Sequence, residues 1–278
     1  LHLSIRRQRQ MCIRDSQNTL LLKAYDLFVD KYPDFSYLLK DIHLWAVTED
    51  EYQMAFQNAA KRLNLPIKST TYQLKQYSIQ LRAELLKTPA QAIIILHKSL
   101  LEAPNESLRI VLHELAHAYH DSMFENTPPT DNVMYFLFQI GERMWKECAA
   151  EYFSAKVLQL EETWSQSVLE REFKSLLYDP SLYPERLGFF FMKCRATCTS
   201  SVQVAEVVGI RNETVAAEKL IEAMDGLQNI LVSGLEQSAT LRADSDFLVQ
   251  LGIKIVNFVY CYYQFYNHTE TFLNQIKG

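Results

Sequence analysis

The sequence predicts a predominantly helical α+β protein with a small β-sheet. Only 7 glycines and 8 prolines occur in 278 residues, which disfavours a turn-rich sandwich or barrel and favours helices. Two short apolar runs are typical of strands, whereas the hydrophobic spacing after residue 161 is helical throughout. Hydrophobic residues make up 48% of the chain and charged residues 22%, as in an ordinary globular protein. No apolar run reaches the roughly 18 residues of a membrane span, so we expect a soluble protein with no membrane partner.

The first sixteen residues, LHLSIRRQRQMCIRDS, are expected not to be native. Residues 11–16 can be encoded by ATG TGT ATA AGA GAC AGN, which resembles the transposon-end adapter of sequencing libraries. An Arg-rich targeting peptide is the alternative interpretation. We therefore leave residues 1–16 out of the fold prediction. Without them the basic side chains fall from 28 to 24 and the acidic ones from 33 to 32, so the net charge changes from -5 to -8, which argues against a nucleic-acid partner.

The first elements after this segment are a helix and a strand. Residues 18–31 carry apolar side chains at helical spacing, and the helix is expected to end before Pro33, because proline disfavours a helical residue in front of it. Residues 42–47 form a candidate strand. Residues 72–86 fit either a strand or a helix, and the pattern does not choose between them.

The next two elements have clearer local signals. Thr48 is expected to cap a helix over residues 49–63, with Glu51 completing a capping box three residues later. Residues 92–96 read AIIIL after Pro89. This short β-branched run predicts the best-defined strand of the chain.

Two long helices follow this strand. Asn105 is the expected N-cap of a helix that runs to about residue 124. After a loop at residues 126–130, Asp131 is expected to cap a helix that runs to about residue 160. Gly141 is a candidate position for a bend in this second helix.

The remainder of the chain is predicted to be entirely helical. The natural division is therefore a mixed unit over residues 17–160 and a helical C-terminal region over residues 161–278. The helices expected in the second region are residues 162–177, 184–198, 212–231 and 244–266.

Residues 113–117 read HELAH, an HExxH motif inside a segment independently predicted to be helical. Positions i and i+4 share one helical face, so His113 and His117 can bind one ion through Zn–N bonds of about 2.0–2.1 Å. Glu114 can point at a water on that ion and act as its general base. Zinc lowers the pKa of such a water to about 7, so the motif predicts hydrolysis at neutral pH. The alternative is a pair of solvated histidines, or core histidines bonded to backbone carbonyls.

A catalytic zinc needs a third protein ligand and one open position. Glu147 and Glu151 lie one turn apart on the following helix, so both face one direction. Glu147 is the preferred ligand, and Glu151 is then free to support a ligand histidine. The small residues Ala149, Ala150 and Ser154 would allow this helix to approach the HExxH helix. The alternative is that both glutamates are solvated.

Other polar residues near the motif are weaker candidates. His120 and Asp121 follow the motif directly, but His120 lies about 10 Å from His113 along the helix axis, too far for both rings to bind one ion. The HxxGxxH extension of metzincins is absent from this part of the sequence. His120 remains a candidate for lining a cleft, and Tyr119 or Tyr152 for polarising a substrate carbonyl.

Together, the strand at residues 92–96, IVLHELAHAYH and ECAAEYFSA resemble ImmA/IrrE-type metallopeptidases. That family pairs an HELGH-like helix with a downstream E-x-x-A-N-x-F-A helix, whose glutamate is the third metal ligand. Glu147, Ala150 and Phe153 match this second element, whereas Glu151 replaces the usual asparagine and Ser154 the usual alanine. The resemblance covers about residues 91–155.

This resemblance implies a zincin-like metallopeptidase core in residues 17–160, dependence on Zn²⁺ and an intracellular role. The implied partner is a peptide or protein substrate, since members of the family often act on a repressor or another regulatory protein. We identify no helix-turn-helix module in this chain, and residues 161–278 match no family that we can name.

The four cysteines after residue 16 show no spacing typical of a disulfide framework, and no signal peptide is visible, so we expect a cytoplasmic protein. Cys194 and Cys198 lie one helical turn apart, but no second pair completes a metal site, and we interpret them as free thiols packed in the helical region.

The favoured function is therefore a zinc metallopeptidase in which His113, His117 and Glu147 bind Zn²⁺ and Glu114 is the catalytic base. The alternative is a non-catalytic, metal-binding regulatory or interaction protein that retains the zincin fold. An intact Glu114 favours the enzyme, because a purely structural zinc needs no base beside its ligands. A zincin acting on a non-peptide amide is a third possibility.

Overall fold

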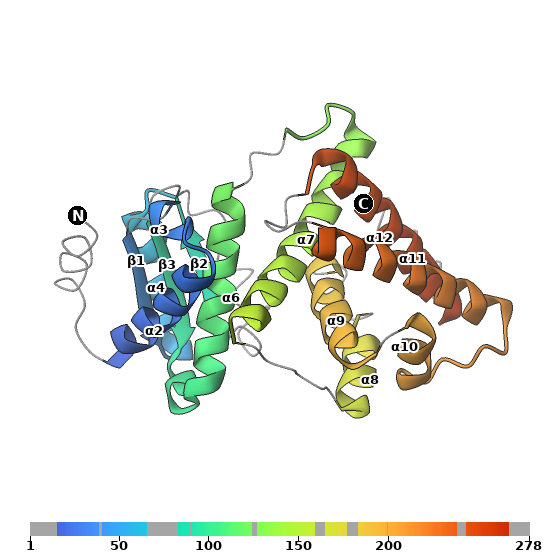
Figure 1. The fold of residues 1–278 in the computed structure, drawn as a ribbon, viewed down its shortest axis with the longest axis horizontal. Coiled ribbons are helices and arrows are strands. Elements are labelled where there is room, and N and C mark those ends of the chain that lie inside the picture. Colours follow the sequence, from blue (N-terminus) through green and yellow to red (C-terminus); the bar gives the residue numbers. More distant parts are fainter. Residues whose placement is uncertain are drawn as a thin grey trace. The chain divides into compact units, whose positions relative to one another are not determined.

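The computed structural model divides into two compact units (Figure 1). The first contains the chain up to Ser122 together with Phe153–Gln159, and the second contains Met123–Tyr152 and everything from Leu160 onward. The helix α7 (Asn132–Leu158) therefore contributes to both units. The adapter-like residues 1–15 lie outside the described part of the chain. The described residues are 16–38, 41–65, 83–88, 91–123, 127–158, 165–176, 183–198, 200–237 and 243–266.

A three-stranded sheet forms the centre of the first unit. Its strands are β1 (Asp41–Val47), β2 (Ala83–Lys87) and β3 (Gln91–His97), in the order β1-β3-β2. The middle strand β3 runs parallel to β1 and antiparallel to β2. Both predicted strands are confirmed, and the C-terminal end of the undecided segment is the strand β2; residues 66–82 lie outside the described part of the chain.

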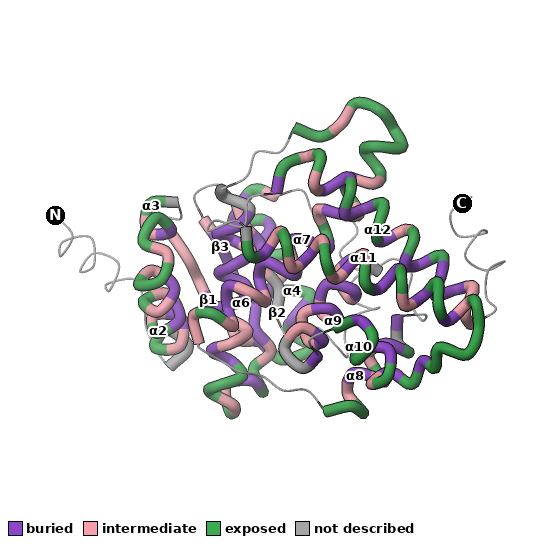
Figure 2. The backbone as a smooth tube through the Cα atoms, turned by 45° about the vertical axis from the view of Figure 1, so that its right-hand side comes forward, coloured by how far each residue is buried: buried purple, intermediate pink, exposed green. Residues whose placement is uncertain are grey.

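The middle strand is buried on both faces. Every residue of the AIIIL run in β3 is 0% exposed (Figure 2), which explains why its sequence is continuously apolar rather than alternating. The helix α4 (Glu49–Arg62) packs against β1 and β3. The core on that side joins Ile93 and Ile95 to residues of α4 and its neighbours, namely Val47, Tyr52, Ala55, Ala59, Ala60, Leu63 and Leu86.

The start of α4 has the predicted capping box. The backbone N–H of Thr48 donates to Glu51 Oε2 at 3.0 Å, and the Thr48 side chain accepts from the third helical residue in return. The backbone N–H and the hydroxyl of Thr48 favour the charged carboxylate, so they lower the pKa of Glu51 below its usual value.

Among its described residues, the first unit also contains α2 (Ser16–Lys31), α3 (Phe35–Leu38), the short 3₁₀ segment η1 (Lys98–Glu102) and α6 (Pro104–Met123). The predicted N-cap at Asn105 is wrong, because α6 begins at Pro104 and Asn105 is its second residue. Pro104 occupies the first helical position, where its fixed φ is favourable and its missing N–H has no helical partner to lose. The hydroxyl of Ser107 then donates to the carbonyl oxygens of Leu100 and Ala103, which ties α6 to η1.

In the second unit, α7 begins where the sequence predicts. Asp131 Oδ1 accepts from the backbone N–H groups of Val133 and Met134, each at 2.9 Å. Gly141 allows α7 to pack closely against α12 (Ser245–Phe265), because a Cβ at this position would overlap the Leu248 carbonyl oxygen. Within the described residues, no helix is long and apolar enough to cross a bilayer.

The other helices of this unit lie near the predicted ranges, but their ends differ. The helix α10 (Ser201–Val207) was not predicted. The helix α11 (Val215–Gln237) begins later and ends later than the predicted range 212–231, and α8 (Gln166–Ser175) begins later than the predicted residue 162. Gly234 does not interrupt α11. A Cβ on this glycine would lie only 2.7 Å from the Phe247 ring and 2.9 Å from the Trp145 ring, so it permits close packing inside the helix. The unit also contains α9 (Tyr183–Thr197).

Candidate metal centre

The HExxH motif lies in the middle of α6, on a helix that is otherwise held in the core. The apolar positions around the motif are at most 5% exposed, and His113 and Glu114 are each 9% exposed. Burying imidazole and carboxylate groups is costly unless they are compensated by hydrogen bonds, ion pairs or metal coordination. The apolar residues concerned are Leu108, Val111, Leu112, Leu115 and Ala116.

The two motif histidines converge on one point. Their Nε2 atoms are 3.0 Å apart, and the ring centroids are 4.6 Å apart with the planes at 83°. Two nitrogens on one tetrahedral zinc, each about 2.0–2.1 Å from the metal, would be roughly 3.3 Å apart. His113 and His117 are thus already close to the spacing that a shared ion requires.

A carboxylate from α7 completes a possible donor set. Within the described residues, the group that could hold a metal ion is His113, His117 and Glu147, whose ligand atoms all lie within 4.8 Å of one another. Glu151 does not belong to this group. Two imidazole nitrogens and one carboxylate fit Zn²⁺ with one position left open for water, although the same donors also suit other divalent transition metals.

The residues that follow Glu147 on α7 are small or well anchored. Cys148, Ala149, Ala150 and Ser154 are all fully buried.

Phe153, 1% exposed, belongs to the first unit and packs edge-on against the Tyr32 and Tyr119 rings, with centroids 4.7 and 5.5 Å away. We call Phe28, Tyr32, Phe35, Tyr119 and Phe153 the aromatic cluster.

The weaker candidates of the motif region are placed elsewhere. Tyr119 is 3% exposed and its ring packs within the aromatic cluster, so it has a core role. His120 is 2% exposed and lies outside the possible metal group. The Arg195 guanidinium carbon sits 5.1 Å from the centroid of the Tyr152 ring. The side chain of Asp121 lies outside the described part of the structure.

One residue beside Glu147 was not predicted. Gly188 of α9 approaches α7 so closely that a Cβ on it would lie 3.0 Å from Glu147 Cβ. The only sequence signal is an isolated glycine inside a helical pattern, which often marks a packing requirement.

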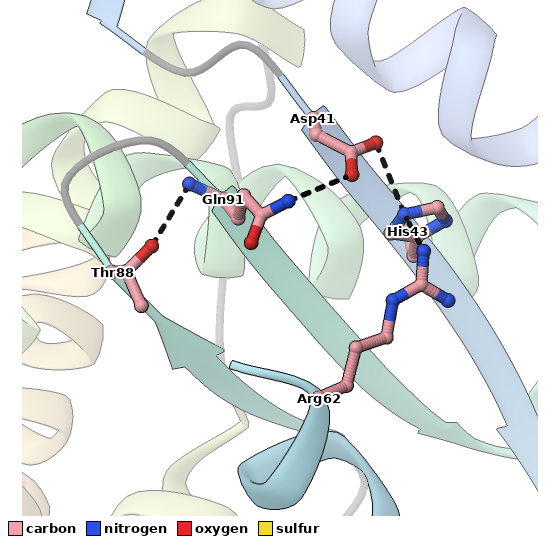
Figure 3. Close-up of polar contacts among 5 residues, drawn as sticks. All are labelled: Asp41, His43, Arg62, Thr88 and Gln91. Carbon is pink, nitrogen blue, oxygen red and sulfur yellow. Dashed lines mark hydrogen bonds and ion pairs between the residues drawn. The ribbon is translucent and has the colours of Figure 1, made fainter. Parts of the chain in front are cut away.

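A separate polar cluster lies on the sheet of the first unit (Figure 3). Arg62 Nη2 donates to His43 Nε2 at 2.7 Å, and Asp41 Oδ1 lies 3.0 Å from the same nitrogen. Gln91 of β3 donates to Asp41 Oδ2 at 3.2 Å, across the parallel register that pairs these two residues. The guanidinium would repel a cation here, so the cluster joins α4, β1 and β3 rather than offering a metal site.

The described cysteines are buried free thiols. Burial is the largest cause that raises the pKa of Cys194 above its usual value, and the neighbouring Cys198 adds to it. In the described part of the chain, neither residue belongs to a group that could hold a metal.

Comparison with protein-family models, curated proteins and solved structures gives no match to this chain. The function is therefore inferred from the chemistry of the residues on α6 and α7.

Proposed function

We propose that this protein is a zinc-dependent metallopeptidase with a zincin-type site. The observation that carries the proposal is the convergence of His113, His117 and Glu147 on one position, with Glu114 buried directly after the first histidine. The resemblance of the HELAH and ECAAEYFSA segments to ImmA/IrrE-type peptidases supports the same conclusion.

The donor set favours a catalytic role over a structural one. A structural zinc site is closed by four protein ligands, whereas three protein ligands leave one position for water. Glu114 has no place among the three ligands, and a structural site would not need a carboxylate in that position. Glu114 is only 9% exposed, so most bulk water is excluded from its carboxylate. Such exclusion suits a general base that accepts a proton from a single metal-bound water.

The residues then have distinct roles in hydrolysis. His113, His117 and Glu147 would hold the ion, and a bound zinc would supply a water whose pKa is lowered to about 7 and would polarise the substrate carbonyl. Glu114 removes a proton as the water oxygen attacks the carbonyl carbon. The C–N bond then breaks, and Glu114 delivers that proton to the departing amine, so the carboxylate is regenerated.

The substrate that fits this chemistry is a peptide or protein. The resemblance to ImmA/IrrE-type peptidases suggests that it is a regulatory protein. The cellular setting proposed from the sequence remains the cytoplasm.

The test compares wild-type protein with Glu114→Gln. We expect stoichiometric zinc in both by elemental analysis, and cleavage of a mixed fluorogenic peptide library that falls by about 10²–10⁴-fold in the variant. Glu170→Gln is the matched control, because Glu170 is a partly exposed residue of α8 that pairs with Lys174. Zinc in both proteins with no cleavage by wild type would instead support the non-catalytic, metal-binding regulatory protein.

A further inference from the structure

Glu147 is packed against a helix of the second unit at its most crowded point. A Cβ on Gly188 would lie 3.0 Å from both Glu147 Cβ and the Met144 carbonyl oxygen, and 3.5 Å from Cys148 Sγ. The Cys148 thiol also donates to the Gly188 carbonyl oxygen at 3.9 Å. The backbone of α9 at Gly188 thus rests directly on the turn of α7 that carries the proposed third ligand.

Two further contacts hold α9 along the same helix. One turn before Glu147, Arg143 forms a two-point ion pair with Glu185, with N–O distances of 2.6 and 2.9 Å. After Glu147, the Arg195 guanidinium lies over the Tyr152 ring. The paired positions advance in the same direction on both helices, so α9 runs parallel to α7 over this stretch.

We propose that α9, through Gly188, positions Glu147 for metal binding, so that the C-terminal helices are part of the metal site rather than a separate module. This inference rests on the ligand set of the proposed function, but not on peptide hydrolysis. Gly188 is a positioning residue, since it acts only through the Glu147 side chain.

The space available shows how sensitive the position is. Non-bonded carbons rest about 3.5–4.0 Å apart, so a methyl group at 3.0 Å must displace its neighbours by a few tenths of an ångström. The crowded atoms are a helical carbonyl oxygen and the first carbon of Glu147, neither of which can rotate away. Metal–ligand distances are acceptable within about 0.2 Å, so a shift of the Glu147 backbone by a few tenths of an ångström is large enough to disturb metal binding.

The experiment measures metal binding by Gly188→Ala. Zn²⁺ affinity is obtained by competition with a chromogenic chelator, and coordination from the visible absorption spectrum of the Co²⁺-loaded protein. We expect Zn²⁺ affinity to fall about 10–100-fold, as is typical when a residue supporting a ligand is changed, and the Co²⁺ spectrum to change shape. Affinity within about twofold of wild type, with an unchanged spectrum, overturns the proposal.

Gly226→Ala is the matched control. It makes the same change inside α11, where the nearest atom to the new Cβ is the mobile end of Lys254 at 3.5 Å. It should leave affinity and spectrum unchanged. Leu220→Ala controls for a general loss of stability, because it truncates a fully buried side chain of α11 without adding an atom beside Glu147. It should leave the Co²⁺ spectrum unchanged. A spectral change like that of Gly188→Ala would overturn the proposal.

If Gly188→Ala does not fold, Glu185→Ala decides the question, because it releases α9 from Arg143 without crowding Glu147. Weaker Co²⁺ binding by this variant supports the proposal, and unchanged binding overturns it. Wild-type protein that binds no metal overturns both this inference and the proposed function. Wild-type protein that binds zinc tightly but cleaves no peptide overturns only the proposed function.

Discussion

Truncation of Phe153 should reveal how strongly the aromatic cluster holds the end of α7. The side chain is 1% exposed and meets two tyrosine rings edge-on. A buried Phe→Ala substitution costs about 3–5 kcal/mol through lost burial and the cavity it leaves. Favourable ring pairs contribute roughly 0.5–1.5 kcal/mol each. Because Phe153 takes part in two such pairs, we expect Phe153→Ala to fall in the upper part of the range for buried phenylalanines and to lower the free energy of unfolding by about 4–5 kcal/mol.

Phe136→Ala provides the control, because it makes the same change on the same helix at a side chain that is 49% exposed. Its effect should stay within about 0.5 kcal/mol. Unfolding is followed by urea titration and calorimetry. At about 2–4 °C per kcal/mol, Phe153→Ala should lower a Tm by roughly 8–20 °C. If it costs no more than Phe136→Ala, the aromatic cluster does not anchor α7 and the reasoning is wrong.

Two other predictions concern the metal ligands and the thiols. At a free zinc concentration of 100 Kd, zinc should stabilise the wild type by about 2.7 kcal/mol. Glu147→Gln should abolish this stabilisation, whereas Glu151→Gln should retain it. Thermal unfolding with and without zinc measures both effects, and the reverse pattern would make Glu151 the ligand. Because burial raises the pKa of Cys194, its thiolate is scarce at pH 8 and alkylation of the native protein should be far slower than in urea. Mass spectrometry of the labelled peptide checks this, and equal labelling rates would contradict the buried position.

The proposed role of α9 changes how the second unit is viewed. The sequence separates a mixed unit from a helical C-terminal region, and it suggests no task for the latter. In the structure, Met123–Tyr152 belong to the same unit as the C-terminal helices, and the turn that carries Glu147 packs against Gly188 of α9. Truncating the chain after residue 160 would remove Gly188 and expose this turn.

Local signals were sufficient where one element determines the outcome. The capping box of Thr48 and Glu51 and the cap at Asp131 depend on residues within one turn, and both are confirmed. The AIIIL run forms a strand because its β-branched side chains suit a sheet buried on both faces. The predicted end of the helix at residue 231 was wrong, because α11 continues through Gly234, where packing against Phe247 and Trp145, far away in the sequence, favours glycine inside the helix.

The same distinction holds at the metal centre. The sequence alone determined that His113 and His117 share a face, since residues four apart on a helix are neighbours whatever surrounds them. Only the tertiary structure decided that Glu147, rather than Glu151, belongs with them to the group that could hold a metal ion, that Tyr119 belongs to the core, and that Gly188 lies beside Glu147. Helical periodicity operates over a few residues, whereas the separation of two helices depends on side chains distributed along the whole chain.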